Sequence, residues 1–198
     1  MEIFMPLINY RKMFKAIEHA ARKNPESVLP LTQHINENQL RSKRWLMDHL
    51  DQYVGYYSEP PKIVIAAGWY GLLGHMIHDR FGWPVTTFDK DDTVKQYGKM
   101  LYPNIEHKTR RVEDHDPFGF DILICTSCEH FSDDVINSWI AKRKKGSLVF
   151  LQSNNYYITE HTNCKGKISE FYNAIKMNCF EGDTLDCNSY DRYMLIGL

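Results

Sequence analysis

The sequence has almost no net charge and no apolar run long enough to cross a membrane. Its 198 residues include 24 Lys and Arg against 25 Asp and Glu, a formal net charge of -1 at pH 7. This balance gives no large-scale attraction to nucleic acid or to a membrane surface, and no apolar run approaches the roughly 20 residues of a membrane span. The start at Met1–Phe4 lacks the basic segment and the long apolar core of a signal peptide.

Repeats and low-complexity tracts are also absent, and cysteine occurs only five times. Five is an odd number in a chain of this size, which predicts reduced thiols and a cytoplasmic protein. The hydrophobic fraction of 43% and the aromatic fraction of 13% indicate a globular protein and exclude a disordered one. The length suits one α/β domain and is too short for two ordinary ones.

Between residues 62 and 152, strand-like and helical patterns alternate. Such alternation predicts a parallel sheet covered by helices on both faces. The link between residues 110 and 120 is too short for a full helix, so we expect an abbreviated crossover there. The strand-like runs lie at 62–67, 84–88, 105–109, 121–125 and 147–152, and the helical patterns lie at 71–81, 92–101 and 133–142.

Two helices are expected before the first strand. Apolar residues recur at helical spacing over 8–21 and over 40–53. Pro25 and Pro30 separate these helices, and the pair that starts at Pro60 ends the second one.

The last part of the chain predicts an antiparallel hairpin. A helix around 168–175 is followed by two strand-like runs, 179–184 and 193–196, which lie too close together for another crossover. We therefore predict a Rossmann-like three-layer α/β sandwich, with a mostly parallel seven-stranded sheet and a C-terminal antiparallel hairpin. This domain would occupy residues 61–198, and residues 1–60 would form an N-terminal helical cap.

A glycine-rich turn follows the first strand. Gly68, Gly71 and Gly74 come directly after the apolar run 63–67, and the second strand ends on Asp89. Glycines let the backbone approach a ligand closely, and a carboxylate about 20 residues further on accepts hydrogen bonds from a ribose diol. We therefore predict a site for an adenosine-containing cofactor. The alternative is a purely structural turn, with Asp89 capping the next helix.

The fourth strand leads into a loop that carries a carboxylate beside an imidazole. At a strand edge this pair can take a proton from an amine, a hydroxyl or a thiol. We predict Glu129 and His130 as the catalytic residues. The alternative is that both side chains only anchor the loop by hydrogen bonds.

The fifth strand ends in amide, hydroxyl and aromatic side chains. Polar side chains at the sheet edge suit a polar planar substrate or the amino-acid end of a cofactor. We predict that the substrate is bound by Ser127, Gln152, Asn154, Asn155, Tyr156 and His161.

Two cysteines and two histidines near the same edge have the composition of a zinc site. They are Cys128, His130, His161 and Cys164. Their spacings, Cys-x-His and His-x-x-Cys, match no strong zinc motif. We therefore expect no metal site.

Two further patterns are typical of other classes of protein. Tyr172 and Lys176 match the Tyr-x-x-x-Lys of short-chain dehydrogenases, which use a nicotinamide cofactor. Only 22 residues follow Lys176, too few for the rest of such a fold, so we expect both to be ordinary helix residues. Basic clusters at 41–44, 110–111 and 142–145 leave RNA or DNA open as a partner.

From residue 60 onward, the alternating strands, the glycine turn, Asp89 and the terminal hairpin resemble the class I S-adenosylmethionine-dependent methyltransferases. More narrowly, Thr126–Phe131, Leu151–Tyr156 and Glu160–Cys164 are similar to segments of phage-encoded methyltransferase-like proteins. The resemblance implies S-adenosylmethionine as the cofactor and an acidic side chain after the third strand that accepts from the adenine amino group. The implied cofactor-binding residues are Ala67, Gly68, Trp69, Gly71, Asp89, Lys90, Glu113, Asp114 and Thr126.

One residue departs from the pattern of that family. Its members usually carry Asp or Glu two residues before the first glycine, where this chain has Ala66. That carboxylate helps to organise the methionine end of the cofactor. In this chain Gln152, Ser153 or a residue of the cap would have to replace it.

The sequence thus predicts transfer of a methyl group to a small polar acceptor, with the methylated atom left open between oxygen, nitrogen and sulfur. The alternatives are a nicotinamide-dependent oxidoreductase and a non-methylating protein that binds S-adenosylmethionine. The cap helices would cover the cofactor or contribute to the interface of a homo-oligomer.

Overall fold

A seven-stranded sheet forms the centre of the molecule in the computed structural model, which describes residues 9–198. The start at Met1–Phe4 and the predicted helical residue Ile8 lie outside the described residues. The strands are β1 (Ile63–Ala66), β2 (Val85–Asp89), β3 (Glu106–Thr109), β4 (Ile122–Cys125), β5 (Leu148–Asn154), β6 (Cys179–Asp186) and β7 (Asp191–Gly197).

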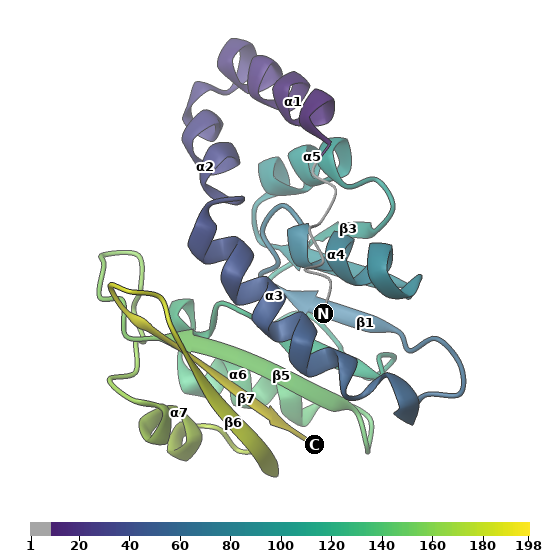
Figure 1. Ribbon diagram of the computed structural model, residues 1–198, viewed down its shortest axis with the longest axis vertical. Helices are drawn as coiled ribbons and strands as arrows, with labels where there is room; N and C mark the ends of the chain where they lie inside the picture. The colour runs from purple at the N-terminus through teal and green to yellow at the C-terminus, as the bar shows by residue number, and fades with distance from the viewer. Residues whose placement is uncertain (1–8) are drawn as a thin grey trace.

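The strand order is β3-β2-β1-β4-β5-β7-β6. The first five strands along the chain pair in parallel, and β7 runs antiparallel to both β5 and β6 (Figure 1). The predicted fold class is therefore confirmed. The helices are α1 (Tyr10–Lys23), α2 (Val28–Gln33), α3 (Glu37–Asp51), α4 (Leu72–Phe81), α5 (Asp92–Leu101), α6 (Asp133–Ala141) and α7 (Ile168–Ala174).

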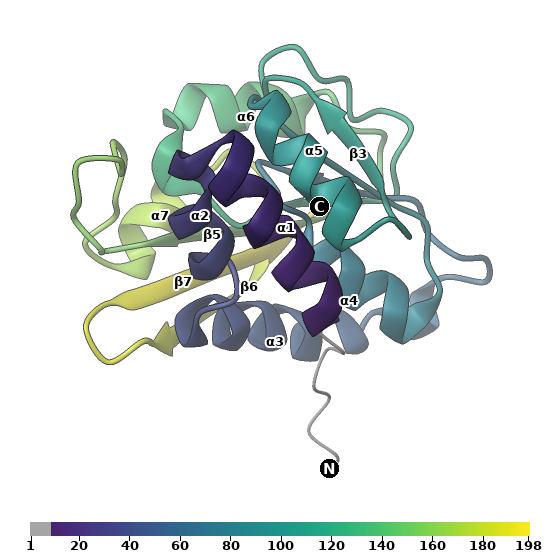
Figure 2. The same cartoon turned by 90° about the horizontal axis from the view of Figure 1, so that it is seen from above.

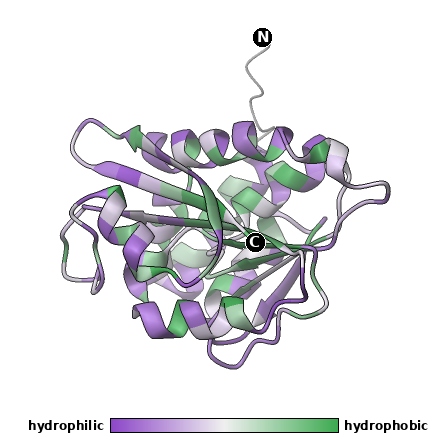
Figure 3. Cartoon of the chain, turned by 90° about the horizontal axis from the view of Figure 1, so that it is seen from below, coloured by the Kyte–Doolittle hydropathy of each residue, from purple (hydrophilic) through white to green (hydrophobic). Residues whose placement is uncertain are grey.

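Alternate residues of the central strands β1, β4, β5 and β7 enter two separate cores. In β1, Ile63 and Ile65 face the core that includes buried residues of α3, α4 and α5, whereas Val64 and Ala66 face the core formed with α6 and α7. Because successive strand residues point to opposite faces, this pattern places the sheet between two helical layers (Figure 2). The strands at the centre of the sheet are mostly apolar, whereas the edge strands β3 and β6 are more polar, and the helices carry polar residues among apolar ones (Figure 3).

The link from β3 to β4 contains no helix, as the sequence predicts. In place of a helix, the ring of His115 covers part of the sheet at β2. It stacks on Phe88 of β2 with the ring centroids 4.3 Å apart and the planes at 10°. Burial lowers the pKa of His115 to about 4, so the ring is neutral while it lies in this core.

The N-terminal part differs from the prediction in two places. Pro30 lies inside α2 and does not separate two helices. Its place near the start of the helix explains why it is tolerated, because the first N–H groups of a helix have no intrahelical partner. The helix predicted over 40–53 ends at Asp51, well before Pro60, and a single 3-10 turn follows at Val54–Tyr56.

Helix α3 belongs to the layer that covers the sheet. Its residues Leu46, Met47 and Leu50 lie in the same core as β1 and β5. The division of the chain at residue 60 therefore remains a prediction. Among residues 9–198, no helix has the length and the apolar character needed to cross a bilayer, and all five cysteines carry free thiols.

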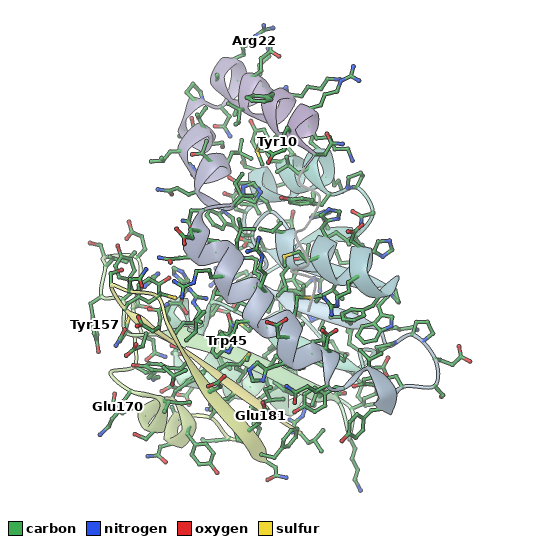
Figure 4. The ribbon with its side chains drawn as sticks, in the orientation of Figure 1. Tyr10, Arg22, Trp45, Tyr157, Glu170 and Glu181 are labelled. Carbon is green, nitrogen blue, oxygen red and sulfur yellow. The ribbon has the colours of Figure 1, made fainter. Side chains whose placement is uncertain are left out.

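Polar contacts fix α3 to the terminal hairpin (Figure 4). The indole N–H of Trp45 donates to Asp183 at 3.0 Å. The imidazole of His49 and the hydroxyl of Tyr53 each lie 2.6 Å from a carboxylate oxygen of Glu181. These contacts hold the helix across β6, so that its preceding turns lie over the end of β5.

Candidate functional site

The turn after β1 has a strained backbone. Ala67 and Trp69 adopt positive φ values of 47° and 51°, and Gly71 has a φ of 93°. Residues other than glycine rarely adopt this region, and such strain gathers at functional sites. A Cβ atom on Gly68 would lie 2.0 Å from Oγ1 of Thr87. Only glycine therefore allows this turn to lie so close to β2.

Asp89 joins the end of β2 to this turn. Its carboxylate accepts backbone hydrogen bonds from Trp69, Lys90 and Asp91, and burial raises its pKa. The N-terminus of α5 is capped by Asp91, whose Oδ1 accepts from the N–H of Thr93 at 2.8 Å. The alternative in which Asp89 caps this helix is therefore wrong. Asp89 lies where a carboxylate can reach a ligand seated on the glycine turn.

A small hollow lies beside Asp89. In this structure it has no room even for a water-sized molecule, whereas sites for whole small-molecule ligands occupy roughly 300–1,000 Å³. An adenosine-sized ligand needs more room than this, so side chains around the turn must move when it binds. The hydroxyl of Thr87 lines the hollow and is buried without a hydrogen-bond partner among the described residues. The lining residues are Trp69, Thr87, Phe88, Asp89, Val94, Lys95, His107 and Lys108.

The two acidic candidates after β3 are exposed to solvent. Glu113 forms an ion pair of 3.3 Å with Arg111, and the backbone carbonyl of Asp114 accepts from Arg110 at 3.2 Å. Lys90 is exposed as well. Contacts of Lys90, Glu113 and Asp114 with a cofactor remain predictions.

A second cluster of functional side chains lies after β4. Glu129 is 2% exposed and belongs to the 3-10 turn Cys128–His130. Its Oε1 lies 3.9 Å from Nε2 of His161, and the rings of His130 and His161 meet edge to face with centroids 4.7 Å apart. The structure thus brings the predicted catalytic pair together with His161, which we predicted as a substrate ligand.

Backbone contacts connect the two loops that carry this cluster. The N–H of Asn163 donates to the carbonyl of Glu129 at 2.9 Å. Nδ1 of His130 lies 2.9 Å from the carbonyl oxygen of Glu160. The loop after β4 and the loop after β5 therefore hold each other in place.

The polar end of β5 lies beneath these loops. Gln152 and Asn154 are completely buried. The amide of Gln152 donates to the carbonyl of Ser42 at 3.4 Å, and Oδ1 of Asn154 accepts from the N–H of Tyr156 at 2.9 Å. In this structure the two amides bond to backbone groups of α3 and of the loop after β5. Their predicted contacts with substrate remain predictions.

The other predicted substrate ligands lie nearer the surface. Oδ1 of Asn155 accepts from the N–H of Asp191 at 2.7 Å, which ties it to the start of β7. The ring of Tyr156 is exposed, and Ser127 is half-buried. Tyr156 and Ser127 are therefore accessible to a ligand.

Two buried cations were missed in the sequence. Arg192 is 5% exposed, donates to the carbonyl of Thr126 at 3.0 Å and lies 3.9 Å from Oε1 of Glu129. Lys43 of α3 is also buried, and this burial, together with Arg192, lowers its pKa to about 7. Antiparallel pairing sets Arg192 opposite Asn154. The position of Arg192 near the start of the last predicted strand was therefore the signal in the sequence that could have placed it at this edge of the sheet.

Because Lys43 is buried, the basic cluster at 41–44 is less exposed than the sequence indicates. This lysine donates to the side chain of Gln39 and does not belong to an exposed basic surface. The cluster therefore offers fewer cations to a nucleic acid than the sequence indicates.

The cysteines do not join the two histidines. The thiol of Cys128 is oriented toward the carbonyl of Cys125 at 3.8 Å, and that of Cys164 donates to the carbonyl of Tyr156 at 3.2 Å. The four-residue zinc composition is therefore not assembled in this structure. Lys176 lies beyond the end of α7, so the expectation that it is a helix residue was wrong.

An open recess borders the cluster. It has a volume of about 530 Å³, within the range of small-molecule sites. Its residues belong to the two loops that carry His130 and His161. They are Ser132, Asp133, Asp134, Thr162 and Asn163.

Comparison with known proteins identifies the fold. No protein-family model and no curated protein sequence matches the chain. Magnesium protoporphyrin IX methyltransferase (ChlM) from Synechocystis PCC 6803, solved with bound SAH, matches with a TM-score of 0.64 at 10% identity, over 82% of this chain and 87% of that one. The PH0226 protein from Pyrococcus horikoshii OT3 matches with a TM-score of 0.62 at 13% identity, over 82% and 92%.

A third structure gives the same result. Geranyl diphosphate C-methyltransferase from Streptomyces coelicolor A3(2), in complex with Mg2+, geranyl diphosphate and S-adenosyl-L-homocysteine, matches with a TM-score of 0.59 at 12% identity, over 80% and 78%. At such low identities the likeness establishes the fold alone. The chain has the Rossmann-like fold found in class I methyltransferases.

Proposed function

We propose that the protein is an S-adenosylmethionine-dependent methyltransferase that acts on a small polar acceptor. The observation that carries this proposal is the contact between the glycine turn and Asp89, in a fold shared with structures solved with SAH. Gly68 has no room for a side chain, and Asp89 keeps a carboxylate at the same edge of the sheet. This is the arrangement that a ribose on a glycine turn requires.

The described residues fit the nucleoside part of such a cofactor. The backbone of Ala67, Gly68 and Trp69 would cradle it, Asp89 would accept hydrogen bonds from the ribose hydroxyls, and Asp114 or Glu113 would accept from the adenine amino group. When bound, S-adenosylmethionine supplies a methyl group that is already activated by a sulfonium. The chain then has to align the acceptor and, where needed, remove its proton.

Glu129 and His130 are the groups that we assign to the acceptor. Nδ1 of His130 faces a carbonyl oxygen, which only accepts hydrogen bonds, so this nitrogen carries the proton. The other ring nitrogen can therefore take a proton from the acceptor. The open recess at Ser132 and Thr162, on the loops that carry His130 and His161, offers the space for a small polar molecule.

The proposal also covers the compartment of the protein, its origin and its partner. The five free thiols support a cytoplasmic location, since structural disulfides persist in oxidising compartments. A phage origin, which the loop segments imply, stays a prediction. We propose a small molecule as the partner, rather than a nucleic acid.

Thermal unfolding with and without ligands tests the cofactor. A ligand present at about 100 times its Kd stabilises the folded state by about 2.7 kcal/mol, so saturating S-adenosylhomocysteine or S-adenosylmethionine should raise the Tm by several degrees. NAD at the same concentration should have no effect. A rise with NAD alone would favour the oxidoreductase.

A further inference from the structure

Glu129, His130 and His161 come together as a group of metal-ligating side chains. One ligand atom from each residue lies within 4.8 Å of the other two. Within residues 9–198, no other group of three or more His, Cys, Asp or Glu side chains meets this condition. The cluster combines one carboxylate with two imidazoles from two separate loops.

Both imidazoles are held in the tautomer that a metal site needs. Nδ1 of His130 lies 2.9 Å from the carbonyl oxygen of Glu160, and Nδ1 of His161 lies 2.7 Å from that of Tyr156. Since a carbonyl only accepts, each Nδ1 carries the proton and each Nε2 presents a lone pair. Metal-bound histidines almost always donate their second nitrogen to such an oxygen.

The carboxylate adds an independent observation. The side chain of Glu129 is 3% exposed, and its Oε2 is buried without a hydrogen-bond partner among the described residues. Its other oxygen lies 3.9 Å from both Arg192 and His161, beyond hydrogen-bond distance. A buried carboxylate oxygen without a partner is unfavourable, and a cation between Glu129 and the two imidazoles would remove this penalty.

The geometry of the group is close to that of a bound ion. A tetrahedral ion with bonds of about 2.1 Å holds its ligand atoms about 3.4 Å apart. The ligand atoms lie within 4.8 Å of one another, so side-chain rotations that shorten these separations by up to about 1.4 Å would close the site around an ion. His130 is exposed, so an ion can reach the group from solvent.

We propose that Glu129, His130 and His161 bind one divalent transition-metal ion, of the class of zinc, cobalt or manganese. Two imidazoles among three protein ligands favour this class over magnesium and calcium, which prefer oxygen ligands. A site with three protein ligands keeps open positions. From the sequence we considered two cysteines with His130 and His161 and expected no metal site. The proposed site differs because Glu129 replaces the cysteines as a ligand.

The open positions indicate the chemical class of the acceptor. An oxygen of the acceptor, from a hydroxyl or a carboxylate, would bind the ion, which lowers the pKa of a bound hydroxyl and fixes its orientation. With its Nε2 on the ion, His130 would position the acceptor and would no longer take its proton, which would pass to solvent from the ion-bound hydroxyl. This use of the ion rests on the proposed function, but binding of the ion does not.

Calorimetric titration with metal ions tests the proposal directly. The full, untagged chain is freed of metal with a chelator and titrated with Zn2+, Co2+ and Mn2+. We expect one site per chain, and a loss of affinity of more than about tenfold in Glu129→Gln, His130→Ala and His161→Ala. His130 is exposed, so His130→Ala carries the test even if Glu129→Gln fails to fold. Saturable binding with this pattern supports the proposal.

Two control variants distinguish binding at this site from binding of the metal ion by other side chains. Cys164→Ser removes the nearest accessible thiol, and His19→Ala removes an exposed histidine of α1; both should bind the ion like the unmodified chain. No saturable binding, unchanged binding in the three ligand variants, or a loss confined to Cys164→Ser would overturn the proposal. Binding of S-adenosylhomocysteine is measured separately, so that failure of the methyltransferase proposal is distinguished from failure of the metal site.

Discussion

Nε2 of His34 lies 2.9 Å from the hydroxyl oxygen of Tyr102, and this bond connects the residue that follows α2 to the end of α5 inside the core. The other ring nitrogen of His34 lies 2.5 Å from the carbonyl oxygen of Leu31, so Nδ1 donates and Nε2 accepts from Tyr102. The bond that Nε2 accepts requires a neutral imidazole, whereas the bond to Leu31 is also made by the charged ring. The attachment of the N-terminal helices to the sheet domain is therefore sensitive to acid.

The free energy of unfolding should fall as the pH falls from about 6.5 to about 4. Burial lowers the pKa of His34 from 6.5 to about 4, so within this window the unfolded chain binds more protons than the folded one. The difference amounts to roughly 3 kcal/mol. His34→Gln should flatten this dependence in urea titrations at pH 4.5 and 7. His115 contributes in the same window, so a slope should persist in the variant. An unchanged slope would contradict this role of His34.

Gly68→Ala should destabilise the protein and remove cofactor binding. The added Cβ would lie 2.0 Å from Oγ1 of Thr87 and 3.1 Å from a methyl carbon of Ile65, and overpacking of this kind costs about 1–3 kcal/mol. Gly55→Ala is the matched control, because nothing lies within 4 Å of its Cβ position. Its stability should be unchanged or higher by up to about 1 kcal/mol. Equal effects of the two substitutions in urea unfolding would refute the steric argument.

Lys43→Met should stabilise the protein more at pH 6 than at pH 10. Burial lowers the pKa of Lys43 from 10.5 to about 7. Burying the charged ammonium group therefore lowers the free energy of unfolding. This destabilisation is fully present below pH 7 and disappears as the pH rises to about 10.5. Methionine fills a similar volume without a charge. Unfolding curves of both proteins at the two pH values measure the difference, and a gain that does not depend on pH would contradict the assignment.

The hydrogen bond between Tyr53, which follows α3, and Glu181 of β6 should be worth about 1.5–3 kcal/mol. The hydroxyl of Tyr53 donates to Glu181 at 2.6 Å, so Tyr53→Phe removes a hydrogen bond to a charged group. Tyr56→Phe is the control, since that ring is 80% exposed. A double-mutant cycle with Glu181→Gln measures the coupling. No coupling would mean that the apolar face of α3 alone holds the helix in place.

The sequence predicted the regular elements well, for a physical reason. From residue 62 onward, the central strands and the helices bury apolar faces, so periodicity alone locates elements such as β4 and α6. The short helix α2 was missed because Pro30 normally indicates a break, and only its position near the helix start makes it tolerable.

The candidate site was predicted only in part. Glu129 and His130 are neighbours in the sequence, so a pattern could find them. Their contacts with Arg192 and His161 depend on how the loops and β7 fold back onto β4. Lys43 could not be identified, because its burial depends on the placement of α3 over β5. Such contacts between distant segments leave no periodic pattern in the sequence.

Binding of S-adenosylhomocysteine, measured by calorimetry on the unmodified chain and on Asp89→Ala, tests the central claim most directly. We predict a micromolar Kd for the unmodified chain, a loss of at least about tenfold in Asp89→Ala, and no change in Asp79→Ala, which alters an exposed carboxylate of α4. S-Adenosylmethionine should behave in the same way, and NAD should not bind. Absence of binding by both sulfur compounds, or equal binding by Asp89→Ala, would contradict the account, and Ala66 would then mark a site that no longer holds a methyl donor.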